Sequence, residues 1–453
     1  MLAAVLSHAG AHRDRYLADV AALAAIPSVS ADPARRADVA RAARWLVDRL
    51  RAAGLANVGL VRTPGAPAVV GRAGPGDGRP TLLVYGHYDV QPAGPAAAWS
   101  HGAFRPTLRG DLLIGRGVSD DKGQLFTHLA AIESWLAVAG ALPVNVVVVL
   151  DGEEEVGSPH LARVLDTVWA GRVPDAAVVS DTRMRDVDTP ALTVSLRGSL
   201  HCRLTVRGAA TDLHSGAYGG VVADPARELC RIVAGLHDRY GRLRAGLDTG
   251  TRPRPGRTPG DPSDRELLAL ARAAVPGPGT VEAGWTAYER GTVRPALVVS
   301  ALDAGLTGGR GRAVVVAQAR AHLNLRLAPG QDPRRMHAEL TRRIRALARP
   351  GTRAELTVAS AAPPVELPVS GPVVAAARAA CRHGFGVEPV LLRAGGTIPA
   401  VYELAVRRGV PTVLIGFALP DDRMHAPDER LSVRAFDRGV RTAAAFLLAV
   451  SRR

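Results

Sequence analysis

The feature that most constrains the fold of this chain is a series of short apolar runs that alternate with helical patterns. The runs cover residues 81–85, 144–150, 176–179 and 410–415, and Gly, Pro or Asp bounds each of them. Such runs are typical of strands that are buried on both faces of a sheet. Apolar side chains recur at helical spacing in residues 33–53, 123–139, 159–170, 398–408 and 434–450. We therefore predict an α/β fold, in which helices flank a mainly parallel central sheet.

The middle of the chain has a different pattern, in which apolar and polar side chains alternate. This alternation, at residues 192–206 and 312–327, is typical of half-buried antiparallel strands. Helical patterns at about 223–240 and 333–348 accompany these strands. A chain of 453 residues is also longer than one core usually supports. We predict that an α+β domain is inserted into the first domain, so that the three segments are 1–196, 197–366 and 367–453.

The composition excludes several classes of partner. The net charge is +15, but the arginines are spread along the chain and aromatic residues make up only 4%, too few for a nucleic-acid stacking surface. No apolar run approaches the roughly 20 residues of a membrane helix, and the first residues lack the cationic start of a signal peptide. We expect no nucleic-acid partner and no membrane association.

The three cysteines are Cys202, Cys230 and Cys381, an odd and unclustered set. This set argues against a disulfide framework or a thiolate metal site. A reducing cytoplasm is the simplest compartment for such a chain, and we expect a cytoplasmic protein. Lys122 is the only lysine among 57 Lys and Arg residues, and the sequence suggests no firm role for it.

Acids and histidines follow the predicted strands at the points where the strands end. In chain order, these side chains are His87 and Asp89, then Glu153 to Glu155, then Asp181, and finally His425 beyond a short loop. A further acid, Asp120, lies just before a predicted helix. Ligands of open α/β sheets bind beyond the carboxyl ends of the strands, so we expect these side chains to meet at one edge. Three carboxylates directly after a buried strand are costly unless cations compensate them.

These side chains make up a charge balance that suits two metal ions. Two Zn²⁺ ions carry four positive charges, which Asp120, Glu155, Asp181 and one hydroxide neutralise, while His87 and His425 add neutral imidazoles. Nitrogen and oxygen ligands of this kind suit zinc, with Mn²⁺ or Co²⁺ as substitutes. The sequence therefore predicts a dinuclear zinc site with Asp120 as the bridging ligand.

Two acids are left over from this ligand set. Glu154 adjoins a predicted ligand but is free of the metals, which makes it the natural general base for the bridging hydroxide. Asp89 is placed to hold the second ring nitrogen of His87. Singly, such acids and histidines more often lie in solvated turns, so the prediction depends on their convergence.

Eight motifs, in the same order along nearly the whole chain, resemble those of the M20 metallopeptidases. Within that family, the chain is most similar to the dipeptidase branch, which includes the cytosolic non-specific and carnosine dipeptidases. The motifs cover residues 86–92, 115–123, 151–158, 180–181, 212–220, 325–331 and 395–399, and the last is His425. No single motif is specific, but the ordered set is.

The resemblance implies roles for the metal-site residues. His87 and Asp181 would bind one zinc, Glu155 and His425 the other, and Asp120 would bridge the two. The implied activity is hydrolysis of the amide bond of dipeptides by a metal-bridging hydroxide, with Glu154 as general base and Asp89 orienting a ligand. The peptide bond between residues 120 and 121 is expected to be cis, as it often is in this family.

The resemblance also implies a partner and a substrate. The inserted domain would be a lid that dimerises the protein, and His214 would reach into the active site of the partner subunit to steady the oxyanion. Arg326 would bind the free C-terminal carboxylate of a small peptide. Thr307, Gly396 and Thr397 would make further substrate contacts.

Some alternatives stay open. An N-acyl-amino-acid amidohydrolase, such as an acetylornithine deacetylase or a succinyl-diaminopimelate desuccinylase, would use the same metal centre. Ala394 departs from the family pattern, where relatives often carry a polar or acidic residue, and the Pro/Gly/Arg-rich segment 248–264 aligns with nothing familiar. A catalytically inactive scaffold would have to lack metal ligands, and here all five are present.

Overall fold

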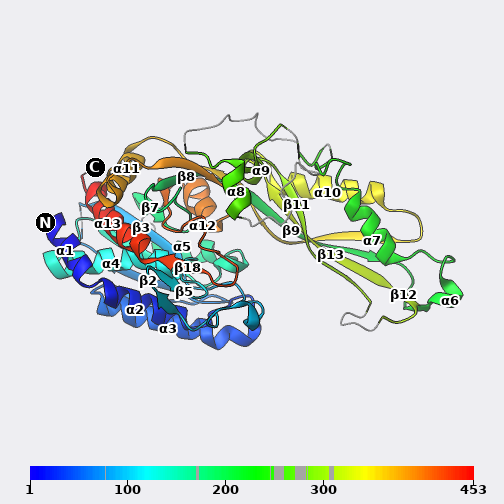
Figure 1. Ribbon diagram of the computed structural model, residues 1–453, viewed down its shortest axis with the longest axis horizontal. Helices are drawn as coiled ribbons and strands as arrows, with labels where there is room; N and C mark the ends of the chain where they lie inside the picture. The colour runs from blue at the N-terminus through cyan, green and yellow to red at the C-terminus, as the bar shows by residue number, and fades with distance from the viewer. Residues whose placement is uncertain are drawn as a thin grey trace.

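The computed structural model describes residues 1–76, 78–169, 173–244, 246–248, 260–270, 282, 284–305 and 311–452. A large α/β part contains both termini, and a narrower arm of strands and helices extends from it (Figure 1). No helix within the described ranges is both long and apolar enough to cross a membrane.

The α/β part is built on a nine-stranded sheet in the order β1-β2-β6-β3-β7-β17-β8-β15, with β16 also paired to β8. The strands are β1 (Ala56–Val61), β2 (Ala68–Ala73), β3 (Thr81–His87), β6 (Asn145–Asp151), β7 (Ala176–Val179), β8 (Ala191–Leu196), β15 (Val365–Glu366), β16 (Val390–Ala394) and β17 (Thr412–Ile415). The four central strands, β6, β3, β7 and β17, are mutually parallel. Antiparallel pairs extend the sheet towards both edges. The predicted fold class is confirmed.

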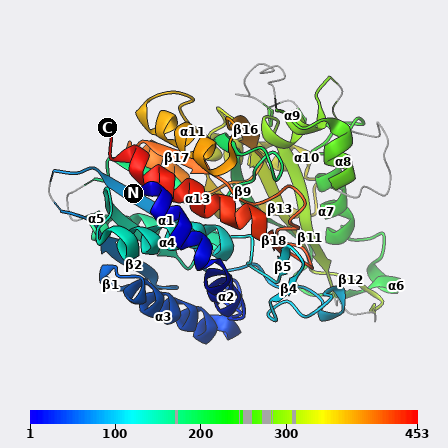
Figure 2. The ribbon, with the colours of Figure 1, turned by 60° about the vertical axis from the view of Figure 1, so that its left-hand side comes forward.

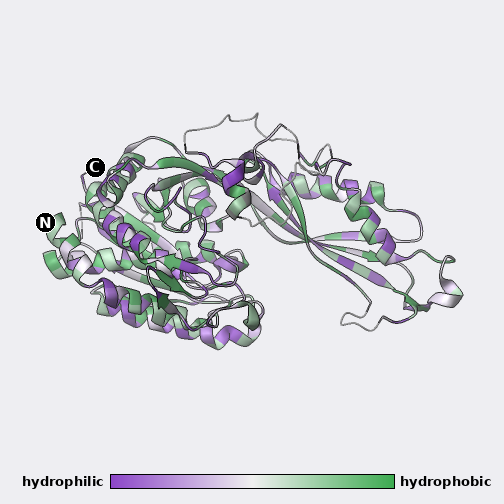
Figure 3. Ribbon diagram, in the orientation of Figure 1, coloured by the Kyte–Doolittle hydropathy of each residue, from purple (hydrophilic) through white to green (hydrophobic). Residues whose placement is uncertain are grey.

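Both faces of the sheet are buried, which explains the continuous apolar runs. Along β3, Leu82 and Val84 pack into one core, and Leu83 and Tyr85 pack into the other. The first core is covered by α1 (Leu2–Ala11), α2 (Arg13–Ala24), α3 (Arg36–Ala52), α4 (Lys122–Ala139), α11 (Pro372–Phe385) and α13 (Val433–Val450). Figure 2 shows α1, α4, α11 and α13 lying together across this face. In Figure 3 the central strands are mostly hydrophobic, while the outer helices carry hydrophilic stripes.

The opposite core is smaller. It is covered by α5 (Leu161–Trp169) and by α12 (Pro399–Val401), which continues as a π-helical turn (Tyr402–Arg407). A separate three-stranded sheet, β4 (Thr107–Arg109), β5 (Leu112–Ile114) and β18 (Arg430–Ser432), lies in the order β18-β5-β4. This small sheet joins the segment before α4 to the segment before α13.

The arm is an antiparallel sheet in the order β11-β13-β9-β14. Its strands are β9 (Gly198–Arg207), β11 (Ala296–Ala304), β13 (Gln318–Leu327) and β14 (Arg353–Ala362). Helices α7 (Pro225–Ala234) and α10 (Pro333–Leu347) bury one face of this sheet. The far end of the arm carries β10 (Leu213–His214), α6 (Ser215–Tyr218) and β12 (Val314–Val315) (Figure 1). Two short helices, α8 (Asp264–Leu270) and α9 (Ala287–Thr292), lie near its base.

The alternating pattern of residues 192–206 covers two strands in different sheets. The chain forms β8 in the large sheet, passes through Arg197, and forms β9 in the arm. Gly198 makes this passage possible, because a Cβ atom there would lie 2.6 Å from the carbonyl oxygen of Ala362 and 2.6 Å from the nitrogen of Pro364. The two connections between the sheets therefore cross in close backbone contact.

This contact predicts that Gly198→Ala destabilises the protein. The added methyl meets backbone atoms that cannot rotate away, and we expect a loss of about 1–3 kcal/mol, as for other overpacked sites. The measurement is the free energy of unfolding in urea, followed by circular dichroism.

Gly10→Ala is the matched control. Nothing lies within 4 Å of the Cβ position of Gly10 in α1, so the same substitution should stabilise that helix by about 0.5–1 kcal/mol. Equal unfolding curves for the two variants would contradict the packing argument at Gly198.

Candidate metal centre

The parallel strands bring the predicted acids and histidines to one edge of the sheet. His87 ends β3, and Asp181 follows β7 by two residues. Glu154 and Glu155 lie on the single 3-10 turn Glu154–Val156, just beyond β6. His425 follows β17 by a loop and has a positive φ of 65°.

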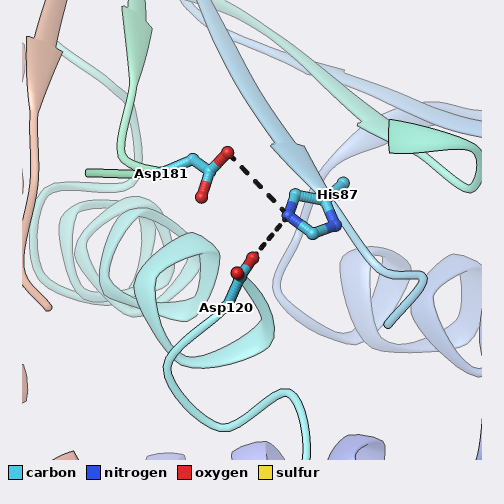
Figure 4. A group of neighbouring side chains, drawn as sticks. All are labelled: His87, Asp120 and Asp181. Atoms are coloured by element: carbon cyan, nitrogen blue, oxygen red, sulfur yellow. Dashed lines mark hydrogen bonds and ion pairs between the residues drawn. The ribbon is translucent and has the colours of Figure 1, made fainter. Parts of the chain in front are cut away.

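One group of potential ligands consists of His87, Asp120 and Asp181. The Nε2 atom of His87 lies 3.0 Å from Oδ1 of Asp120 and 4.0 Å from Oδ2 of Asp181 (Figure 4). Figure 4 shows the two carboxylates converging on this one ring nitrogen from different elements of the fold.

A second group consists of Asp120, Glu155 and His425. The Nε2 atom of His425 lies 2.8 Å from Oδ2 of Asp120 and 3.5 Å from Oε2 of Glu155. Asp120 belongs to both groups and turns one oxygen towards each histidine. The structure thus brings together all five residues that the sequence suggests as ligands, in two groups that share one carboxylate.

The electrostatics of the cluster show an excess of buried negative charge. Burial and the charge of Asp120 raise the pKa of Asp181 to about 8 and that of Glu155 to about 7. Burial, and then neighbouring charges, raise the pKa of Glu154 well above its ordinary value. Burial opposes ionisation of Asp120 as well, but hydrogen bonds from His425 and His87 give this carboxyl a net lowered pKa.

This cluster fits a pair of divalent cations. Its donors are imidazole nitrogens and carboxylate oxygens, the usual ligands of zinc and related metals. One oxygen of Glu155, Oε1, is buried without a hydrogen-bond partner in the described part of the chain. Buried polar atoms without partners are uncommon in folded proteins, and a bound metal ion would be a partner for this oxygen.

Asp89 contacts both His87 and the turn that carries Glu154 and Glu155. Its Oδ1 atom lies 3.3 Å from Nδ1 of His87. The same carboxylate accepts hydrogen bonds from the backbone nitrogens of Glu154 at 3.2 Å and Glu155 at 3.1 Å, and from Oγ of Ser30 at 2.6 Å. Asp89 therefore fixes the turn that carries Glu154 and Glu155, in addition to orienting His87.

Glu429 holds the segment that carries Asp120. Its Oε1 atom accepts hydrogen bonds from the backbone nitrogens of Ser119 and Asp120, both at 3.0 Å. Its Oε2 atom accepts one from Nη1 of Arg116 at 2.7 Å, and all of this is buried. The sequence analysis did not find Glu429, although it follows His425 by four residues. The peptide bond between Asp120 and Asp121 is cis, as expected.

Lys122, the only lysine of the chain, is fully buried and bonds to backbone carbonyl groups. The Nζ atom of Lys122 donates hydrogen bonds to the carbonyl oxygens of Leu23 at 3.0 Å and Ile26 at 2.9 Å. Burial lowers the pKa of Lys122 to about 7, while Asp89 and Glu429 act in the opposite direction. The side chain ties the end of α2 to the start of α4.

A cavity of about 1290 Å³ extends from the ligand groups to the base of the arm. Glu154, Arg326, Gly396 and Thr397 line it, as do four of the five potential ligands. Nη1 of Arg326 donates a hydrogen bond to Oγ1 of Thr397 at 3.3 Å, and this hydroxyl donates to the carbonyl oxygen of Arg197 at 2.6 Å.

One predicted site residue, His214, lies away from the cavity. His214 is exposed at the far end of the arm, does not line the cavity of its own chain, and accepts a hydrogen bond from the backbone nitrogen of Gly216 at 3.0 Å. Thr307 lies outside the described residues, as does most of the predicted 248–264 loop.

The α/β fold and the two potential ligand groups that share Asp120 indicate a metal-dependent enzyme. A model of peptidase family M20/M25/M40 matches residues 83–449. The chain belongs to this family, and it is therefore a hydrolase that acts on peptide bonds.

Similar proteins support the predicted branch of the family. The chain is 27% identical over 450 residues to the Cys-Gly metallodipeptidase DUG1 of Saccharomyces cerevisiae, covering 93% of this chain and 92% of that protein. It is 27% identical over 446 residues to the cysteinylglycine-S-conjugate dipeptidase of Corynebacterium striatum, covering 96% of each. The resemblance to the dipeptidase branch is confirmed.

Solved structures support the fold. The structure of the dipeptidase Dug1p from Saccharomyces cerevisiae matches with a TM-score of 0.88 at 24% identity, covering 100% of this chain and 99% of that one. The structure of human carnosine dipeptidase 1 matches with a TM-score of 0.86 at 23% identity, covering 100% of both chains.

The contacts of Asp89 predict that Asp89→Asn weakens metal binding by about 10- to 100-fold, the usual effect of losing a group that orients ligands. An asparagine amide nitrogen cannot accept the backbone hydrogen bonds that the carboxylate accepts. The measurement is metal affinity by competition with a chelator. Ser30→Ala is the control, since it removes only one hydrogen bond of about 1 kcal/mol, and its loss should be smaller. Wild-type affinity in Asp89→Asn would contradict this role.

Proposed function

We propose that the protein is a dinuclear zinc dipeptidase that hydrolyses the amide bond of small peptides with a free C-terminal carboxylate. The observation that carries the proposal is the pair of ligand groups that share Asp120 beside Glu154, at one end of a cavity that also contains Arg326. Dipeptidases similar to this chain over more than 90% of its length support the choice of substrate.

In this proposal His87 and Asp181 hold one metal, Glu155 and His425 hold the other, and Asp120 bridges them. When bound, the two cations polarise the scissile carbonyl and make water a better nucleophile. Zn²⁺ is the metal of choice for these ligands, with Mn²⁺ or Co²⁺ as substitutes.

Glu154 is the proposed general base. It is half-buried, lines the cavity, and belongs to neither ligand group. Its carboxylate takes a proton from the attacking water, whose oxygen forms a bond to the carbonyl carbon. The same proton then passes from Glu154 to the leaving nitrogen as the carbon–nitrogen bond breaks. Asp89 keeps the turn of Glu154 in place through the hydrogen bond to its backbone.

Arg326 is the proposed site for the substrate carboxylate. Its guanidinium bonds to the hydroxyl of Thr397 and has no carboxylate partner within the described structure. A guanidinium presents a planar pair of donors that matches a carboxylate. Gly396 and Thr397 adjoin this position on the cavity wall, and we assign Thr307 a contact there from the resemblance alone.

The segment 197–366 is the proposed lid and dimerisation domain. His214 directly precedes α6, which lies at the far end of the arm (Figure 1), and it is exposed and does not line the cavity of its own chain. In a dimer of arms, the partner subunit's His214 would reach the cavity and steady the oxyanion. The three free cysteines suit a cytoplasmic location.

A second candidate is an N-acyl-amino-acid amidohydrolase with the same metal centre. One observation favours it. In the described structure, the only acids that line the cavity are Asp120, Glu154, Glu155 and Asp181. No further carboxylate is present there to bind the free ammonium group of a dipeptide, and Ala394 lines the cavity where relatives often carry a polar residue.

A panel of substrates tests the proposed function. Chelator-treated protein should be inactive and should regain activity with Zn²⁺, Mn²⁺ or Co²⁺. Dipeptides should then have a higher kcat/KM than N-acetyl amino acids with the same C-terminal residue. Cleavage of the N-acyl compounds alone would favour the second candidate, and no cleavage with any of the three metals would refute both.

Glu154→Gln should lower kcat by about 10²- to 10⁴-fold, the usual range for loss of a general base, while metal content stays unchanged. Glu153→Gln is a matched control on the neighbouring residue, because the carboxylate of Glu153 contacts Nδ1 of His160 at 2.7 Å and does not line the cavity. The measurements are single-turnover rates and metal analysis of both variants. Turnover near wild type in Glu154→Gln would refute the mechanism.

A further inference from the structure

Outside the ligand groups and Glu154, the charged side chains that line the cavity are all basic. Five arginines do so in the described structure, and they are Arg183, Arg185, Arg326, Arg393 and Arg423. Two of them have acidic partners, Arg185 with Glu266 at 2.6 Å and Arg393 with Asp261 at 2.8 Å. These two pairs are neutral and need no ligand.

Arg183 is different, because no carboxylate lies within ion-pair distance of it in the described residues. It is exposed within the cavity, and its Nε atom donates only to the sulfur of Met424 at 3.3 Å. Arg183 follows Asp181 by two residues, and Met424 precedes His425. The contact with Met424 therefore places the guanidinium on the side of the cavity where the loop that carries His425 lies.

Arg423 adds a second, loosely paired cation to this side of the cavity. Its Nη1 atom lies 3.6 Å from Oδ2 of Asp428. That carboxylate is engaged elsewhere, since Asp428 accepts hydrogen bonds from the backbone nitrogen of Ser100 at 2.8 Å and from its hydroxyl at 2.7 Å. The Nη1 atom of Arg423 is therefore beyond hydrogen-bond distance of Asp428, and its donors can reach a ligand in the cavity.

A cation beside a metal centre is electrostatically unfavourable unless an anion compensates it. Once the metals balance their ligands, the arginines make the cavity positive, and a positive cavity concentrates anionic substrates. Arg326 accounts for one substrate carboxylate in the proposed function. Arg183 lies on a different segment from Arg326 and has no structural ion pair to explain it.

We infer that Arg183, assisted by Arg423, forms a binding site for a second carboxylate of the substrate. The preferred substrates are then amides with two carboxylates, either acidic dipeptides or amino acids acylated by a dicarboxylic acid. This inference rests on the proposed function and specifies its substrate class. A carboxylate bound there makes charge-assisted hydrogen bonds to the guanidinium fork.

The test compares substrates that differ only in one carboxylate. Glu-Ala is compared with Gln-Ala, Ala-Glu with Ala-Gln, and N-succinyl-alanine with N-butanoyl-alanine, each by kcat/KM. In at least one pair, the wild-type enzyme should prefer the acidic member by about tenfold or more, the effect of one charge-assisted hydrogen bond. The pair that shows the preference identifies which part of the substrate faces Arg183.

Arg183→Gln should abolish this preference, and Arg183→Glu should reverse it. Both variants should lower kcat/KM much more for the acidic member than for the other member of the same pair, and an unchanged circular dichroism spectrum with unchanged metal content shows that they fold. Arg163→Gln is the matched control, because Arg163 is exposed on α5 and outside the cavity, and it should keep the full preference. No preference in the wild type, or a preference that survives Arg183→Gln, would overturn the inference.

A binding measurement separates this inference from the proposed function. Calorimetry with zinc-loaded protein should give tighter binding of glutarate than of its monoamide, and Arg183→Gln should remove the difference. If this difference in affinity is measured but no amide in the panel is cleaved, the second-carboxylate site is supported and only the proposed function is refuted. Equal binding of the two compounds to wild-type protein would overturn the second-carboxylate site.

Discussion

The carboxylates of Asp120, Glu154, Glu155 and Asp181 lie together at one edge of the sheet, and their repulsion governs what surrounds them. The apolar sheet and helices behind them exclude water, so solvent cannot screen these charges. Arg116 and Lys122 are the cations on the buried side, and their contacts go to Glu429 and to backbone carbonyls. Neither contacts the four carboxylates directly. The charge that the cluster requires must therefore come from the cavity side, where metals can enter.

Buried carboxylates that accept backbone hydrogen bonds position both ligand-bearing turns of the site. Asp89 accepts hydrogen bonds from the consecutive backbone nitrogens of Glu154 and Glu155, and Glu429 does so from those of Ser119 and Asp120. In each case a buried carboxylate binds the main chain of a ligand-bearing turn, which leaves the side chains of that turn free to face the cavity. A site held by its backbone is preorganised before any metal binds, and preorganisation limits the cost of binding.

The sequence predicted the parts of this architecture that local pattern controls. The central strands were predictable because each is apolar at most positions, and the acids and histidines at their ends were predictable because parallel strands share an edge. The boundary at 196/197 was predicted where the chain changes sheets, but the alternation of apolar and polar side chains through Gly198 did not show that a strand ends there. Glu429 was missed because an acid in a loop after a proline is typical of a solvated turn. Only the tertiary fold shows that this acid is buried against Ser119.

Chemistry and substrate selection occupy different surfaces of this fold. The ligand groups and Glu154 lie at the rigid edge of the parallel sheet, whereas Arg326 lies on β13 of the arm, whose alternate residues, such as Leu325, are buried against helices. Because side chains alternate along a strand, positions on the open face of β13 can change without disturbing that core. Arg183 lies on the other wall, in the loop after β7, where a loop residue is equally free to vary. Under the proposed function, two walls that can vary independently around a fixed centre would let one metal site act on amides with different charged groups.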